Sequence, residues 1–214
     1  MRSVHSKKRA VIAAGYLLGT FALYRGLPEY GAASGTGTLS LNAMMLAFLL
    51  PTASVITDRL LRSLCVEHPV AEPDATHVIA IYDAIMLRFI IFVLGVHAVM
   101  LLGLARGLVG HAWAAHVVPL MLGLTMIGIG NLLPRTRPNL AIGIRTHRSL
   151  ADRTLWARIH RAAGYLLVTS GMVIVLASIA APAPISSSVV LVTGPVMLVG
   201  AWLLVRFAGK RVHA

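Results

Sequence analysis

The sequence predicts an all-α integral membrane protein with six transmembrane helices in a single membrane domain, and three observations support this prediction. First, 57% of the 214 residues are hydrophobic and only 12% are charged. Soluble domains carry about 25% charged residues, so too few polar side chains remain to cover a water-facing surface. Second, the apolar runs approach the roughly 20 residues that a helix needs to cross a bilayer. Third, the basic residues are distributed unevenly between the connecting loops.

The six predicted spans follow one another with charged, proline or glycine residues between them. In chain order they are about 10–27, 39–57, 79–105, 115–133, 162–181 and 189–206. Each run is continuously apolar, whereas a strand of a membrane barrel alternates in polarity over about ten residues, so helices are favoured. The first span has a basic start and is followed by small residues at 31–34. It therefore also resembles a secretory signal, and its cleavage is the alternative interpretation.

The basic residues predict the orientation of these spans. Sixteen of the 19 Lys and Arg residues lie in segments that the topology places on one side, and two lie on the other. Because cytoplasmic loops are enriched in Lys and Arg, both termini are predicted to be cytoplasmic. The formal net charge of +12 then predicts attraction to anionic lipid headgroups rather than direct binding to nucleic acid, since no basic soluble face exists.

Three ionisable residues fall within the predicted third span: Asp83, Arg88 and His97. A charge at the centre of a membrane helix costs about 2.5–3.5 kcal/mol on insertion scales, so each needs an explanation. Asp83 and Arg88 are five residues apart, on different helix faces, and are not expected to pair. Two interpretations are open: Arg88 extends to the interface with Asp83 in water, or one or both residues face the bundle and bond to the basic fourth loop.

His97 is the deepest of the three, and a transmembrane histidine can ligate haem or relay protons. A bis-histidine haem site needs a second ligand at similar depth, and none is evident. The sequence therefore predicts no cofactor and no metal. The single cysteine, Cys65, excludes an internal disulfide.

The loop at 134–161 is the most informative segment and is predicted to be ordered. Pro134 and Pro138 prevent continuation of the preceding helix, because proline lacks an amide donor. We expect Asn139 and Arg145 to fix the loop through hydrogen bonds to backbone groups. Ile142 and Ile144 give it an apolar side, which we expect to turn toward the lipid interface.

A new helix is predicted to begin at Ser149, which has the spacing of a capping box with Asp152, and to continue unbroken into the fifth span. Trp156 is expected at the water boundary, where indole is favoured, and His160 is expected to stack on it at the i, i+4 spacing. Arg137, Arg145 and Arg161 are candidates to bind an acidic protein face, a phospholipid phosphate, or carboxylates of the same chain.

The stretch GNLLPRTRPNLAIGIRTHRSLADRTLWARIHRAAG, residues 130–164, resembles the signature of the SdpI/YfhL family of bacterial membrane proteins. Many fixed positions recur at fixed spacing, over about a third of the chain with the flanking spans. The matching residues are Gly130, Asn131, Pro134, Asn139, Gly143, Ile144, Arg145, Thr146, Leu150, Trp156, His160, Arg161 and Gly164.

Two departures from the family pattern matter. His147 and Arg148 replace the family's Pro-Trp, and the first external loop lacks the signature that many relatives carry there. The chain thus resembles a family whose best-known member is an immunity protein. That protein protects its producer from a secreted killing peptide and binds a winged-helix repressor. The resemblance therefore implies a non-enzymatic protein of a bacterial plasma membrane, in toxin immunity or signalling, although the departure in the external loop prevents transfer of the toxin's identity.

Two other classes of function are weighed against this interpretation. A small-solute transporter or channel would use Asp83, Arg88 and His97, which share one span. A membrane enzyme would use His160 with Asp152, but eight residues separate them, about two helical turns, which is too far for a direct hydrogen bond within one helix.

Overall fold

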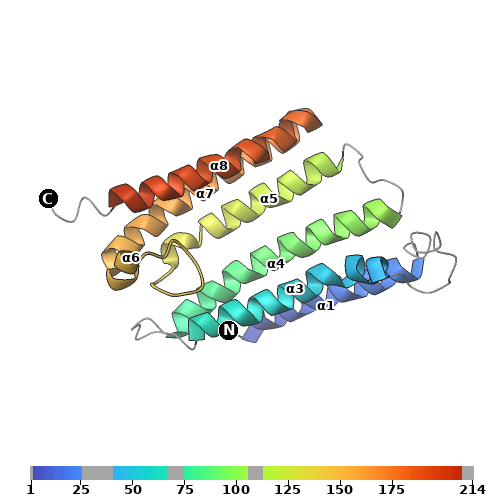
Figure 1. Ribbon diagram of the computed structural model, residues 1–214, viewed down its shortest axis with the longest axis horizontal. Helices are drawn as coiled ribbons and strands as arrows, with labels where there is room; N and C mark the ends of the chain where they lie inside the picture. The colour runs from blue at the N-terminus through green and yellow to red at the C-terminus, as the bar shows by residue number, and fades with distance from the viewer. Residues whose placement is uncertain (1, 26–40, 67–74, 106–112, 209–214) are drawn as a thin grey trace.

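The computed structural model describes residues 2–25, 41–66, 75–105 and 113–208, and within them all regular structure is helical (Figure 1). In chain order the elements are α1 (Arg2–Arg25), α3 (Leu41–Val66), α4 (Ala75–Ala105), α5 (Ala114–Gly130), the 3₁₀ helix η1 (Leu133–Arg135), α6 (His147–Ala151), α7 (Arg153–Ala180) and α8 (Ala183–Ala208). The predicted class, a polytopic helical membrane protein, is confirmed. The first external loop, with the small residues at 31–34, and the adjoining ends of the spans 10–27 and 39–57 lie outside the described residues.

In the part of the chain that the structure describes, five helices are long and apolar enough to cross a membrane: α3, α4, α5, α7 and α8. The helix α1 is not among them, because only 15 residues separate its basic residues Arg9 and Arg25. It nevertheless packs along α3 and α4, and its 24 residues extend over about 36 Å at 1.5 Å per residue. A sixth span at α1 and a cytoplasmic location of both termini stay predictions.

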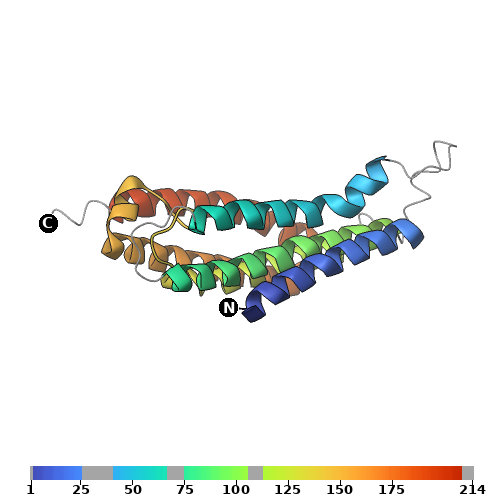
Figure 2. The ribbon, with the colours of Figure 1, turned by 90° about the horizontal axis from the view of Figure 1, so that it is seen from below.

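The long helices run along one common axis in two groups of three (Figures 1 and 2). In one group α1, α3 and α4 all contact one another, in the other α5, α7 and α8 do so, and α4 against α5 joins the two groups. The first described turn of α1, the last of α8 and the segment 131–152 lie toward the same end of the bundle (Figure 1). We call this the loop end.

The helices α5 and α7 approach each other closely because glycines face each other at two levels. A Cβ atom on Gly130 would lie 2.9 Å from the carbonyl oxygen of Gly164, and one on Gly164 would lie 2.7 Å from that of Gly130. Gly123 and Gly171 repeat this relation at 2.7 and 2.6 Å. Small residues allow such backbone contact between membrane helices, so the two glycine pairs set the distance between the elements that flank the loop.

Candidate functional site

The candidate site is the segment 131–152 with the first turns of α7, which together carry the sequence motif. The helix α5 ends at Gly130, before the two prolines that were predicted to prevent its continuation, and Asn131 follows as its C-cap. Pro134 lies at the start of η1, and a Cβ atom on Gly164 would touch its ring at 3.1 Å. The chain then turns away from the helix axis into extended backbone at Thr136. The buried Pro138 lies just beyond this turn.

Asn139 holds the turn of the loop from inside. Its Oδ1 accepts hydrogen bonds from the amides of Ala141 at 2.9 Å and Ile142 at 2.7 Å, and its Nδ2 donates to the carbonyl oxygen of Arg137 at 2.8 Å. The guanidinium of Arg145 donates to the carbonyl oxygen of Leu140. The prediction that Asn139 and Arg145 fix the loop through backbone groups is therefore confirmed.

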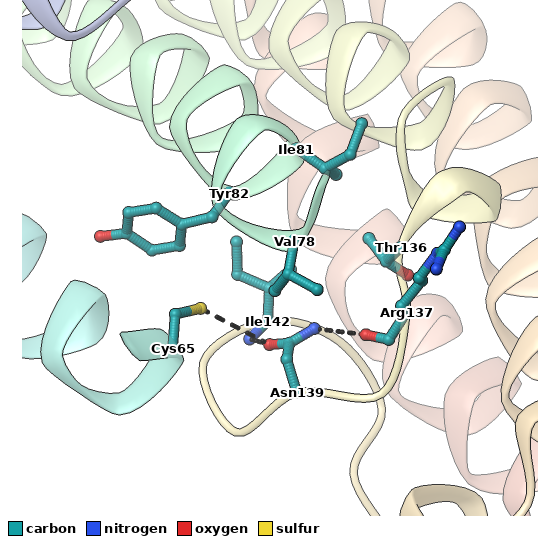
Figure 3. Close-up of a pocket in the computed structure, with 8 residues that line it drawn as sticks. All are labelled: Cys65, Val78, Ile81, Tyr82, Thr136, Arg137, Asn139 and Ile142. Carbon is teal, nitrogen blue, oxygen red and sulfur yellow. Dashed lines mark hydrogen bonds between the residues drawn. The ribbon is translucent and has the colours of Figure 1, made fainter. Parts of the chain in front are cut away.

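The apolar side of the loop packs on the α3 and α4 helices rather than toward lipid. Ala141 is buried in a cluster with Cys65 and Tyr82, and Ile142 packs against that cluster. Figure 3 shows Ile142 and Asn139 facing these helices, with Cys65 Sγ 4.0 Å from Asn139 Oδ1. The expected orientation of Ile142 toward the lipid interface was wrong, because Ile142 packs against the buried apolar cluster to which α3 and α4 contribute.

Trp156 and His160 form a buried stack beneath the loop. Their ring centroids are 3.9 Å apart with an interplanar angle of 16°, which confirms the predicted stacking. Trp156 is 1% exposed and His160 0% exposed, so Trp156 is not the interfacial anchor that was expected. Its indole N–H donates to the carbonyl oxygen of Thr136 at 3.1 Å, which ties α7 to the beginning of the loop.

Both imidazole nitrogens of His160 are engaged. Nε2 accepts from the amide of Ile144 at 3.0 Å, so Nδ1 must carry the proton that it shares with the carbonyl oxygen of Trp156 at 2.9 Å. Gly143, next to Ile144, has a φ of +107°, and a Cβ atom there would lie 2.0 Å from Nε2. Only glycine satisfies both the backbone conformation and the contact with the ring.

The helix that leads into the fifth predicted span begins differently from expectation, because two short-range caps are present where one was predicted. One cap begins α6 and the other begins α7. Thr146 is the N-cap of α6 and forms a reciprocal capping box with Ser149. Asp152 has extended backbone and caps α7, where its Oδ1 accepts from the amides of Thr154 at 2.8 Å and Leu155 at 3.2 Å. The Ser149–Asp152 box and the unbroken helix were therefore wrong. The hydroxyl of Thr154, together with these amides, lowers the pKa of Asp152.

The arginines of the site point mainly away from the protein. Exposed side chains belong to Arg135, Arg145, Arg148, Arg153, Arg158 and Arg161, while Arg137 is half-buried. Asp152 is the single acidic residue between 131 and 161, and it caps α7. The loop therefore combines an internally bonded framework with a strongly basic outer surface.

The polar residues of the predicted third span do not join this site. Asp83 is buried and binds Lys8 at 2.8 Å and Arg62 at 2.5 Å. It therefore faces the bundle, as the second interpretation expected, but its partners come from α1 and α3 and not from the fourth loop. Lys8 also binds Asp58 at 2.7 Å. Sequence reasoning missed this ionic cluster of four residues. The hydroxyl of Tyr82 also donates a hydrogen bond to the cluster, at 2.9 Å from Asp58 Oδ1. The signal that was available is that both acids lie near the basic ends of their spans.

Arg88 and His97 have separate local partners. Arg88 donates to the carbonyl oxygen of Ala84 at 2.7 Å and lies against Gly128 of α5. His97 is fully buried, and its Nε2 lies 2.9 Å from the carbonyl oxygen of Leu46 in α3. Within the described ranges, no three His, Cys, Asp or Glu side chains gather as metal ligands would.

The fold and this site together define the class: a multi-pass helical membrane protein with an ordered, basic loop between two closely packed helices. Residues 135–206, about a third of the chain, match the SdpI/YfhL protein family, in agreement with the resemblance that the sequence motif indicated. The matched segment includes most of the loop, α7 and the larger part of α8. No curated protein and no solved structure matches the chain significantly.

Proposed function

We propose that the protein acts in immunity to a secreted antimicrobial peptide and in the associated signalling, with the loop between α5 and α7 as its output surface. The observation that carries this proposal is that the motif contains two kinds of residue, those that hold the loop and those that are exposed on it. Asn139, Gly143 and His160 hold the loop from inside, while exposed arginines leave a basic surface of fixed shape at the loop end. Such a surface suits recognition of a partner better than chemistry.

The proposed partner on this surface is a cytoplasmic transcriptional repressor with an acidic face. Opposite charge steers association and sets the orientation of the partner. On this proposal the loop end faces the cytoplasm of a bacterium, and the secreted peptide acts from the other side of the plasma membrane.

The engagement of the two residues considered for an enzyme supports a non-enzymatic role. Asp152 is occupied as a helix cap, and both nitrogens of the buried His160 already have partners. The alternative of a solute pathway gains no support either, because within the described helices Asp83 binds Lys8, Arg88 donates to Ala84 and His97 bonds to Leu46, so that the three side chains have separate partners.

The test is survival of the source bacterium after deletion of the gene and challenge with the peptide fraction that the same organism secretes. Wild-type protein is expected to restore survival, and Arg148→Glu to fail at equal abundance in the membrane, because this exposed side chain holds nothing in the loop. Lys7→Glu is the matched control, since Lys7 is also exposed and basic but lies on α1. Equal survival with and without the gene refutes the immunity proposal.

The variant Arg145→Ala distinguishes a role of Arg145 in the output surface from a role in folding of the protein. Loss of survival with normal abundance supports the loop as an output surface, whereas loss of the protein from the membrane makes the bond from Arg145 to Leu140 a requirement for folding alone.

A further inference from the structure

An open groove lies along one face of α7 at the loop end. Thr154, Ala157, Arg158, Arg161, Ala162 and Tyr165 line it. These positions recur at intervals of three and four residues, so they form one stripe of the helix. None of them belongs to the buried face that carries Trp156 and His160.

The two guanidinium groups of the groove are available to a ligand. Arg158 and Arg161 are exposed, and across the described residues neither forms a hydrogen bond or an ion pair. The charge of Arg158 is the smallest of the effects that lower the pKa of Asp152. The groove therefore holds two adjacent positive charges, a pattern suited to phosphate oxygens.

The groove continues directly into an apolar surface. Tyr165, Met172, Leu176 and Ile179 follow at helical spacing on the same face of α7, and they are 68%, 51%, 62% and 71% exposed. Arg161 is the last charged residue before this stretch. Tyrosine is enriched where a membrane helix leaves the headgroup region, so the arginines lie at headgroup depth and the stripe at acyl-chain depth.

The neighbouring helix α8 also indicates that Arg158 and Arg161 lie at headgroup depth. Gly200 of α8 packs against Leu166 of α7. The turns of α8 that follow Gly200 therefore lie at the same level along the bundle as the groove. There the Arg206 guanidinium lies 5.1 Å from the centre of the Trp202 ring, a second basic and aromatic pair at the boundary.

We propose that this groove is a binding site for an anionic phospholipid. Its phosphate binds Arg158 and Arg161, and one acyl chain lies along the apolar stripe below Tyr165. A soluble phosphate compound would use the two charges but not the continuous apolar face, and for this reason we assign the site to lipid.

The test uses the full-length protein in detergent and native mass spectrometry with phosphatidylglycerol or phosphatidylcholine. We expect retained phosphatidylglycerol on the wild type and a decrease of about tenfold or more in Arg158→Gln/Arg161→Gln, since each basic side chain near a membrane surface contributes a several-fold gain in affinity for anionic lipid. The matched control is Arg135→Gln/Arg148→Gln, which removes two exposed charges at the same end of the bundle and is expected to retain the lipid.

Three results overturn the proposal: equal retention of the two lipids, an equal decrease in the control, or displacement of the lipid by excess inorganic phosphate, which would assign the site to a soluble anion. Arg158→Lys/Arg161→Lys covers the case in which the glutamine variant does not fold. It keeps both charges and is expected to retain phosphatidylglycerol above phosphatidylcholine, and loss of this preference in folded protein contradicts a charge-based site.

Discussion

At the residue scale, the motif acts through backbone geometry rather than through reactive groups. Asn139 replaces missing backbone partners, Gly143 supplies a positive φ, and His160 accepts one amide of the loop. The hydrogen bonds of Asn139 could be predicted because asparagine commonly bonds to the backbone two residues on. The reason for Gly143 could not, because the ring that excludes a side chain comes from a helix 17 residues away.

Gly143→Ala tests this local geometry. The added methyl group meets both an unfavourable φ and the His160 ring, so we expect a loss of about 1–3 kcal/mol in loop stability. Limited trypsin digestion of the detergent-solubilised protein should then cleave faster at the loop arginines. Gly194→Ala is the control, since a Cβ atom there meets nothing within 4 Å. Unchanged cleavage in Gly143→Ala contradicts the proposed constraint.

At the scale of the element, α7 is the helix that organises the site, because α5, α6, α8 and η1 all contact it. Its apolar length was evident from the sequence. Its first residue was not, because Ser149 and Asp152 were predicted to form one capping box and Asp152 is instead itself the N-cap of α7. The extended backbone of Asp152 separates α6 from α7.

The contact between α5 and α7 gives a prediction at this scale. In Gly123→Ala the new methyl group would lie 2.7 Å from the carbonyl oxygen of Gly171, so the two helices must separate. We expect a loss of about 1–3 kcal/mol, typical of overpacking, seen as a lower melting temperature in detergent. Gly194→Ala, which adds the same methyl group on α8, should leave the melting temperature unchanged. A similar decrease in both variants would indicate loss of glycine as such, not helix contact.

At the scale of the whole molecule, the ionic cluster joins the three helices of the first group. Lys8 comes from α1, Asp58 and Arg62 from α3, and Asp83 from α4. Its two cations balance its two carboxylates. A buried cluster of this kind is costly to form, but it becomes far more costly when one partner is removed and a charge is left uncompensated.

Lys8→Met tests the role of the cluster. The variant leaves the buried Asp83 and the part-buried Asp58 without their shared cation, and we expect a loss of about 3–5 kcal/mol, or a strongly reduced amount of folded protein. Thermal unfolding monitored by circular dichroism measures the loss. Lys7→Met is the matched control because Lys7 is exposed and should be neutral. We also expect Asp83→Asn to restore part of the lost stability in the Lys8→Met background. If it restores none, the unpaired carboxylates are not the cause of the lower stability of Lys8→Met.

The predicted orientation can be measured directly in intact cells. In a Cys65→Ser background, Ser187→Cys at the exposed start of α8 should react with a membrane-impermeant maleimide. Arg148→Cys in the loop should react only after the membrane is permeabilised. The opposite pattern would place the loop end outside the cell and reverse the topology.

The sequence by itself determined the membrane class, the helical architecture and the resemblance of the loop and the helices after it to the SdpI/YfhL family, because apolar length and motif spacing are local properties of the chain. It also determined the stack of Trp156 on His160, which helical periodicity dictates. Tertiary structure alone decided which residues meet across helices: the burial of the loop on α3 and α4, the glycine pairs, and the pairing of Asp83 with Lys8 from 75 residues earlier. The physical reason is that the cost of a buried charge or a close backbone contact depends on what the neighbouring helix presents, and sequence spacing along one helix contains no record of that neighbour.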